Sequence, residues 1–277
     1  MRYLAIAGLI SGLVAGAASA QDRILSLGGS VTEIVFALGE GDRLIARDTT
    51  SSFPPQVEEL PDVGYLRALS PEGVLSVEPD LVIAEDGAGP PEAIAVLEAA
   101  SVPFITVPDG YDRAAVRAKI LAVADALEVP EKGAELADKV DDALIAAMNA
   151  AAGAEEKRVM FVLSMQGGRI LASGTGTAAD GIIRLAGAEN AVTAYEGYKP
   201  LTDEAAITAR PDVILMMDRG GRHATDDTNL FSHPGLAVTP AARNKAVVRI
   251  DGLLLLGFGP RTPEAVQRLS DALTGAG

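Results

Sequence analysis

The chain has 277 residues and a formal net charge of −15, with 23 Lys and Arg against 38 Asp and Glu. Nucleic-acid binding is therefore disfavoured, because phosphate recognition needs a basic surface. Cysteine is absent and histidine occurs twice, which excludes disulfides, thiol nucleophiles, Cys-ligated metals and sites built from several histidines. The chain is long enough for one large domain or two smaller ones.

The first twenty residues are typical of a secretory signal peptide. Arg2 precedes an apolar run from Leu4 to Ala17, and Ala18-Ser19-Ala20 forms a cleavage site. A membrane anchor is disfavoured because the run is shorter than the roughly 18–20 residues of a span. We expect residues 1–20 to be removed and the rest to be a soluble periplasmic protein, without a lipid anchor because no cysteine can carry one.

Strands and helices alternate over the next hundred residues. Short apolar runs predict strands at 23–27, 42–47, 81–84 and 104–107, and helical spacing predicts helices at 31–38, 91–100 and 114–127. Ser70-Pro71-Glu72 is typical of a helix start, and Pro79-Asp80 ends that helix. This alternation favours a parallel sheet covered by helices.

A long helix is predicted over Pro130–Ala152, closed by Gly153. A second alternating series follows, with strands at 158–164, 213–217 and 246–250 and helices at 177–185, ending at 206–210, and at 263–273. The expected fold is α/β: two lobes, 21–127 and 154–277, with mostly parallel sheets flanked by helices. One long interlobe helix within 128–153 joins them.

The two lobes contain similar segments. Tyr65 precedes Leu69-Ser70-Pro71-Glu72, and Tyr198 precedes Leu201-Thr202-Asp203-Glu204. A Pro-Asp pair follows each glutamate at the same spacing, and an apolar strand follows each pair. A duplicated unit is favoured over chance, and it predicts that Tyr65 and Tyr198 lie in equivalent loops that face each other across a cleft.

Tyr65 lies in Gly64-Tyr65-Leu66-Arg67. Two interpretations are open. Tyr65 is a half-buried packing residue, or it is a ligand contact or metal ligand, since a ferric ion or a nearby guanidinium favours the phenolate form. Arg219 and Arg222 follow an apolar strand, and open α/β sheets bind ligands beyond the carboxyl ends of their strands. The two arginines either bind an anionic group of a ligand or are solvated surface residues.

Glu72 and Glu204 occupy matching positions at two helix starts. They either stabilise the helix dipoles or form a pair of outward charges that hold a partner protein.

Several segments together resemble a known family: LGGSVTEIVFALG (27–39), DVGYLRALSPEGVLSVEPDLVIA (62–84), YEGYKPLTDEA (195–205) and LLLLGFGPRTPEA (253–265). The chain resembles periplasmic substrate-binding proteins of ABC importers, the class with two lobes joined by one helix. The VGYLRALSPE segment is most similar to the haem-binding members. The resemblance covers essentially all of the chain after residue 20.

The resemblance implies roles for individual residues. Tyr65 matches the tyrosine that coordinates ferric haem iron, and Arg67 matches the arginine that favours its phenolate form. Arg219 lies where relatives place an arginine facing the haem, and Glu72 and Glu204 match glutamates that dock onto the membrane permease.

Tyr198 faces the same cleft by the internal similarity, and Lys199 or Arg222 would meet the haem propionates. Some relatives have a histidine in the segment that is 163–168 here and hold two haems. This chain has none there, so two haems are in doubt.

The leading hypothesis is thus a monomeric periplasmic haem-binding protein, with ferric haem as its transported ligand and ABC permease subunits as its partner. A ferric-siderophore or corrinoid carrier of the same class is the alternative. An exported cleft enzyme is disfavoured, because the sequence has no catalytic triad, pair of ligand histidines or nucleotide motif.

Overall fold

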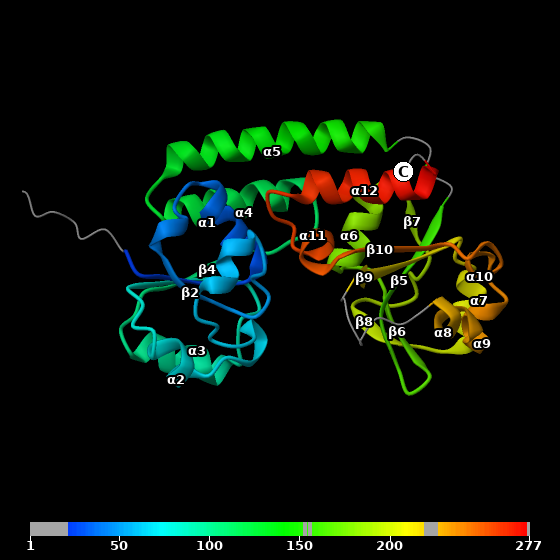
Figure 1. The fold of residues 1–277 in the computed structure, drawn as a ribbon, viewed down its shortest axis with the longest axis horizontal. Coiled ribbons are helices and arrows are strands. Elements are labelled where there is room, and N and C mark those ends of the chain that lie inside the picture. Colours follow the sequence, from blue (N-terminus) through cyan, green and yellow to red (C-terminus); the bar gives the residue numbers. More distant parts are fainter. Residues whose placement is uncertain (1–21, 152–153, 155–156, 219–226, 276–277) are drawn as a thin grey trace, which may run out of the picture.

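The computed structural model describes residues 22–275 apart from 152–153, 155–156 and 219–226. Two α/β lobes lie side by side, and one long helix runs across both of them (Figure 1). The expected signal peptide, at residues 1–20, lies outside the described residues, as do Arg219, Arg222 and His223. Among the described residues, no helix combines the length and the apolar character that crossing a bilayer requires.

The N-terminal lobe is built on a parallel four-stranded sheet in the order β2-β1-β3-β4. The two central strands are almost wholly buried, because helices cover both faces of the sheet. Short 3₁₀ turns lie at Gly41–Arg43, Pro55–Glu59 and Leu66–Ala68. The elements of this lobe are β1 (Ile24–Leu27), α1 (Gly29–Ala37), β2 (Leu44–Arg47), α2 (Pro71–Leu75), β3 (Leu81–Glu85), α3 (Pro91–Ala99), β4 (Phe104–Val107) and α4 (Arg113–Ala126).

The long helix is α5 (Pro130–Ala150), with proline at its first turn, where no amide partner is lost. Its buried side chains recur at helical spacing and form one apolar stripe: Gly133, Ala137, Val140, Leu144 and Ala147. Glycine is required at 133, because a Cβ there would lie 2.2 Å from the Cβ of Ala124 on α4. The predicted end of this helix, at Ala152 and Gly153, lies outside the described residues.

The C-terminal lobe has a six-stranded sheet in the order β10-β9-β5-β6-β8, with β7 paired to β5. Its strands are β5 (Arg158–Gln166), β6 (Arg169–Ser173), β7 (Glu189–Asn190), β8 (Tyr198–Leu201), β9 (Val213–Asp218) and β10 (Val247–Asp251). Its helices are α6 (Ala178–Leu185), α7 (Asp203–Ala209), α8 (Asp227–Ser232), α9 (Pro234–Ala237), α10 (Pro240–Asn244), α11 (Gly252–Leu256) and α12 (Thr262–Thr274).

This second sheet is mixed, whereas the sequence predicted only its parallel part. A hairpin turn at Gly167-Gly168, both at positive φ, sends the chain back antiparallel as β6, and β6 then pairs antiparallel with β8. Tyr198 is therefore the first residue of a strand rather than a loop residue. The prediction that Tyr65 and Tyr198 occupy equivalent loops is wrong, because the hairpin converts only the second loop into an edge strand.

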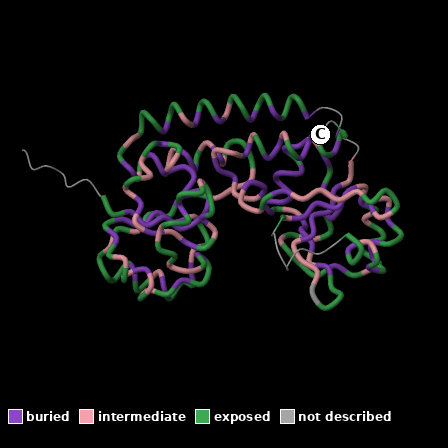
Figure 2. Tube along the Cα trace, in the orientation of Figure 1, coloured by how far each residue is buried: buried purple, intermediate pink, exposed green. Residues whose placement is uncertain are grey.

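The two lobes share a continuous hydrophobic core (Figure 2). α5 contacts α4 in the first lobe and α12 in the second. Below it, α1 approaches α11 so closely that a Cβ on Gly29 would lie 2.4 Å from Leu253. An ion pair joins Glu33 to Arg261, whose guanidinium lies 3.6 Å from the centre of the Phe53 ring. Direct packing thus supplements the linking helix in holding the lobes together.

Candidate functional site

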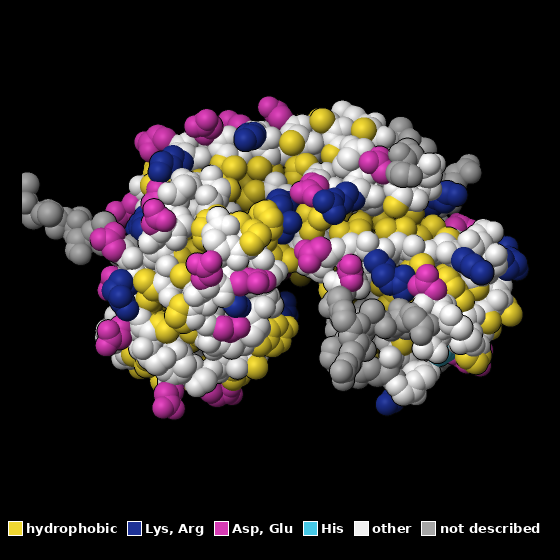
Figure 3. Space-filling model, viewed as in Figure 1, with side chains coloured by type: hydrophobic (Ala, Val, Ile, Leu, Met, Phe, Trp, Pro, Cys, Tyr) yellow, Lys and Arg dark blue, Asp and Glu magenta, His cyan; other side chains and the backbone are white. Residues whose placement is uncertain are grey.

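Figure 3 shows a deep notch between the two lobes, open on the side away from α5. The carboxyl ends of β3 and β4 lie toward the second lobe, since Glu85 and Asp109 reach a lysine that also contacts Gly257. In open α/β sheets this edge is the usual place for a ligand. We therefore expect a ligand site at this boundary between the lobes.

Tyr65 lies at the surface, on a short loop that hydrogen bonds hold in place on both sides of it. Gly64 adopts a φ of 99°, and its amide donates to Asp62 Oδ1 at 2.8 Å. Leu66 is buried beneath, and its carbonyl accepts from the Gly89 amide at 2.9 Å. The Tyr65 ring is 46% exposed, more than that of any other tyrosine in the described chain.

Arg67 follows on the same loop and has an exposed side chain. A Cβ placed on Gly87 would lie 3.8 Å from its Nη1, so the guanidinium extends along the 85–90 turn at the end of β3. Its charge reaches two tyrosines, Tyr111 and Tyr198, and lowers the pKa of each against the larger effect of burial. Arg67 is thus a positive charge that faces residues of both lobes.

Tyr198 comes from β8 and lies against Phe161 of β5, with their ring centres 6.2 Å apart. Burial raises the pKa of its phenol, while the nearby polar groups of Thr177 and Ala179 at the start of α6 and the charge of Arg67 oppose the shift. The ring is still 37% exposed. Tyr198 therefore presents a partly exposed aromatic ring that is suited to packing against a ligand.

Tyr111 completes this group, and the sequence analysis did not select it. It lies between β4 and α4, and its ring is edge-on to that of Phe258 in the second lobe, with the ring centres 5.4 Å apart. Its backbone packs on Gly181 of α6. Burial and the adjacent carboxylate of Asp109 raise its pKa well above the ordinary value. Its position just after a strand end was the signal that could have identified it.

The phenol groups therefore differ in what they can do. Burial raises the pKa of Tyr111, Tyr195 and Tyr198, which keeps all three protonated. Tyr65 is the exposed phenol beside a guanidinium-bearing loop residue. Among the described tyrosines it is the most exposed and therefore the most accessible to a bound ligand.

A buried lysine links the carboxyl ends of β3 and β4 to the second lobe. Lys119 of α4 is 0% exposed, and its Nζ donates to Glu85 Oε1 at 2.6 Å and Asp109 Oδ1 at 2.8 Å. It also lies 3.2 Å from Ser30 Oγ and 3.4 Å from the Gly257 carbonyl of the other lobe. This network fixes Asp109, which in turn faces the Tyr111 hydroxyl.

Not every predicted residue joins this group. Lys199 is next to Tyr198 on β8, so its side chain points to the opposite face, where its Nζ lies 5.7 Å from the centre of the Tyr195 ring. Arg219 and Arg222 lie outside the described residues, so the structure leaves their predicted ligand contacts as predictions.

His233 lies directly before α9 in the second lobe. It is 8% exposed and caps α9, accepting from the Gly235 amide at Nδ1. Its Nε2 lies 2.9 Å from the Gly168 carbonyl. The hairpin that the sequence analysis missed brings Gly168 to this ring, so both nitrogens of His233 have partners within the second lobe.

Glu72 and Glu204 each lie in the first turn of a helix, α2 and α7, as predicted. The N-caps are also equivalent, since Ser70 accepts from the Gly73 amide and Thr202 from the Ala205 amide. Both glutamates are exposed, and neither carboxylate has a charged or hydrogen-bonding partner within the part of the chain that the structure describes. They are available to a partner molecule.

Over the described ranges, no group of three or more His, Asp or Glu side chains is arranged to hold a free metal ion. Arg67, Tyr111 and Tyr198, which come from both lobes, offer a guanidinium and aromatic rings, and these suit a planar, partly anionic ligand.

The comparisons with known proteins agree with this architecture. The model of the periplasmic binding protein family matches residues 24–253, and the chain belongs to that family. Its members and its structural neighbours are binding proteins rather than enzymes.

Among solved structures, the chain is 46% identical to the periplasmic haem-binding protein BhuT in complex with two haems, with a TM-score of 0.85 over 91% of this chain and 98% of that one. It is 39% identical to the periplasmic haem-binding protein RhuT from Roseiflexus sp. RS-1, with a TM-score of 0.88 over 92% and 99%. A curated relative, the vitamin B12-binding protein of Yersinia pestis, is 26% identical over 87% of this chain and 85% of its own length.

Proposed function

We propose that this protein captures ferric haem in the notch between its lobes and delivers it to the permease of an ABC importer. The observation that carries the proposal is the exposed phenol of Tyr65, two residues before Arg67, whose own charge reaches tyrosines of both lobes. The similarity to haem-binding relatives at 46% and 39% identity supports it. In this proposal Tyr65 ligates the iron, while Arg67 stabilises the phenolate by its charge.

The other residues would hold the rest of the ligand. Tyr198 and Tyr111 would pack against the macrocycle, because both are aromatic, lie within reach of the charge of Arg67 and keep their own protons. Arg219, Arg222 and Lys199 remain proposals as propionate partners. Lys199 would have to leave the Tyr195 ring to serve in that role.

The test is the spectrum of purified apoprotein titrated with ferric haem. We expect a five-coordinate, high-spin complex with a phenolate-to-iron charge-transfer band. Tyr65→Phe should lose that band and release haem faster. Tyr195→Phe is the matched control, because this phenol hydrogen-bonds within the second lobe to the Ala172 carbonyl. An unchanged spectrum in Tyr65→Phe, or a larger change in His223→Ala, would contradict the assignment.

A corrinoid ligand is the second candidate, favoured by the 26% identity to a vitamin B12-binding protein. The higher identities to haem-binding proteins make haem the better-supported ligand. Parallel titrations with ferric haem and cyanocobalamin separate the two, since a corrinoid carrier would bind the second with Tyr65 off the metal.

The number of haems is a separate proposal. We infer one, because Tyr65 is the proposed protein ligand and His233 is engaged by Gly168 and Gly235. BhuT, at 46% identity, binds two. An end point of two haems per chain in the titration would overturn the inference.

Delivery would use Glu72 and Glu204, one on each lobe, to meet cationic side chains of the permease. Their exposure and their equivalent helix positions support this role.

The proposal also includes export to the periplasm after loss of residues 1–20 and a monomeric state. Its domain bounds are two lobes at 21–127 and 154–277, joined by a linking helix within 128–153.

A further inference from the structure

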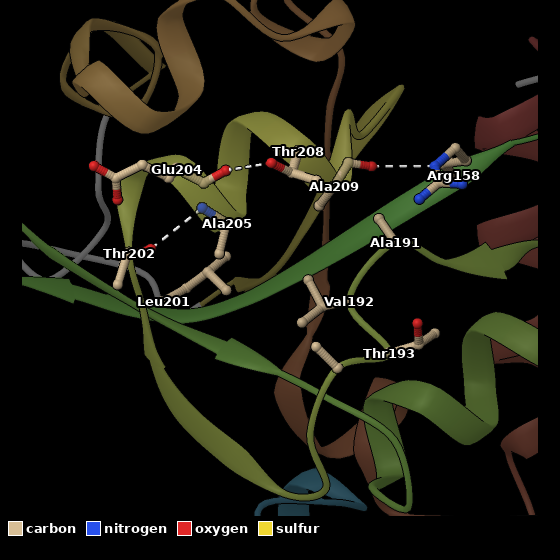
Figure 4. Close-up of a pocket in the computed structure, with 11 residues that line it drawn as sticks. Arg158, Ala191, Val192, Thr193, Leu201, Thr202, Glu204, Ala205, Thr208 and Ala209 are labelled. Carbon is tan, nitrogen blue, oxygen red and sulfur yellow. Dashed lines mark hydrogen bonds between the residues drawn. The ribbon is translucent and has the colours of Figure 1, made fainter.

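A pocket of about 520 Å³ lies beside α7 on the second lobe (Figure 4). None of the residues grouped at the notch lines it. Glu204 is at one end of the pocket and Arg158 at the other, as the close-up shows. The middle is lined by apolar side chains, namely Ala191, Val192, Leu201, Ala205 and Ala209.

The polar groups around this pocket are largely turned away from it. Thr202 Oγ1 accepts from the Ala205 amide, and Thr208 Oγ1 donates to the Glu204 carbonyl at 2.7 Å. Arg158 Nε donates to the Ala209 carbonyl at 3.1 Å. A small-molecule site usually has several polar groups that converge on the ligand. This pocket instead has the carboxylate of Glu204 and the guanidinium of Arg158 at its two ends, the hydroxyl of Thr193 in its lining and an otherwise largely apolar interior.

Apolar surface continues on the other side of Glu204. Ile207 follows Glu204 by three residues and so lies one turn along the same face of α7. Its side chain is 42% exposed. We call the pocket, Glu204 and Ile207 together the α7 surface. It places an unpaired negative charge between two apolar contacts.

We propose that the α7 surface binds a permease segment that presents a basic side chain to Glu204 and an apolar side chain to the pocket. The inference rests on the proposed function and extends it from one charge to a mixed apolar and ionic interface. Charge complementarity selects this partner, because the chain has a net charge of −15 and Glu204 lacks a counter-ion within the described residues. Burying the apolar contacts supplies affinity that an exposed ion pair alone does not.

The equivalent position in the first lobe differs in its exposure. Glu72 on α2 is followed three residues later by Leu75, as Glu204 is followed by Ile207. Leu75 is partly buried against the core of its own lobe, whereas Ile207 is exposed. The second lobe therefore offers more apolar surface beside its glutamate than the equivalent residue offers in the first.

Two variants test the α7 surface without touching the notch. Ala205→Leu fills the mouth of the pocket from an exposed helix position, and Ile207→Ser removes the exposed apolar side chain. Val238→Ser is the matched control, because Val238 is a 57% exposed apolar residue of the same lobe that does not line the pocket. Each variant is first checked for wild-type haem affinity and thermal melting.

The probe is the haem importer's permease with its ATPase, held in lipid nanodiscs and identified by haem uptake with the wild-type protein. We expect Ala205→Leu and Ile207→Ser each to dock about tenfold more weakly, and Val238→Ser to dock as wild type does. The loss in Ile207→Ser should persist in high salt, because apolar contacts are not screened, whereas the loss in Glu204→Gln should shrink.

Three other results overturn the inference in distinguishable ways. If wild type supports uptake and both α7 variants dock normally, the α7 surface is not part of the interface and the proposed function stands. If the variants instead abolish self-association of the haem-free protein in sedimentation, the occupant is a second copy. If wild type binds no haem or supports no uptake, the proposed function fails and this inference fails with it.

Discussion

Replacing Lys119 with methionine is the perturbation whose size the structure defines best. Methionine keeps most of the volume and removes the charge. Lys119 is fully buried between Glu85 and Asp109, whose side chains are each only 17% exposed. The change would leave two neighbouring carboxylates without their shared cation. It would also remove the hydrogen bond that Lys119 donates to the Gly257 carbonyl of the other lobe.

Removing one partner of a buried ion pair costs about 3–5 kcal/mol, because the remaining charge has lost both its water and its counter-ion. For a chain of this size each kcal/mol lowers the melting temperature by about 2–4 °C. Lys119→Met should therefore melt roughly 6–20 °C below wild type. The double variant Lys119→Met/Glu85→Gln should recover more than about 1 kcal/mol, since it removes one of the two stranded charges.

The assay is thermal unfolding of the haem-free protein followed by circular dichroism, with urea unfolding at 25 °C as a second measurement. Lys132→Met is the matched control, because Lys132 pairs with Glu40 from a side chain that is 55% exposed. The reasoning fails if Lys119→Met melts within about 3 °C of the Lys132→Met control, or if the double variant is no more stable than Lys119→Met.

Three further predictions concern acid stability, haem retention and transport. The hydrogen bond from Lys132 lowers the pKa of Glu40 below 4.5, so the pair stabilises the fold above that pH and its contribution is lost as the pH falls through the lowered value. Lys132→Met should cost about 0.5–1 kcal/mol in urea unfolding at pH 7 and progressively less as acid protonates Glu40, and a difference that grows in acid would contradict this. Arg67→Ala should release haem faster than wild type in stopped-flow transfer to an acceptor, but more slowly than Tyr65→Ala; the reverse order would remove Arg67 from its supporting role. Glu72→Lys/Glu204→Lys should abolish uptake into permease vesicles with haem binding intact, each single change being milder. Glu92→Lys is the control, because Glu92 also follows a proline at a helix start, on α3; normal uptake by the double variant would exclude docking through these glutamates.

The sequence alone determined the features that depend on short-range patterns. Apolar runs and helical spacing located the strands of the first lobe, and Pro130 with its apolar stripe located α5. The Ser-Pro-Glu and Thr-Asp-Glu starts of α2 and α7 were also readable, because caps and first-turn charges are local signals. The family resemblance rested on the same stretches of sequence, and the family match confirms it.

The tertiary structure decided which distant residues meet. Because of the hairpin at Gly167-Gly168, Tyr198 lies in a strand and His233 is buried against Gly168. His233 and Gly168 are 65 positions apart in the sequence. Lys119 meets Gly257 at a separation of 138 residues, and Glu33 meets Arg261 at a separation of 228. Tyr111 belongs to the notch because α6 and Phe258 fold against it. Such contacts follow from how whole elements pack, and periodicity within one segment carries no information about the element that will cover it.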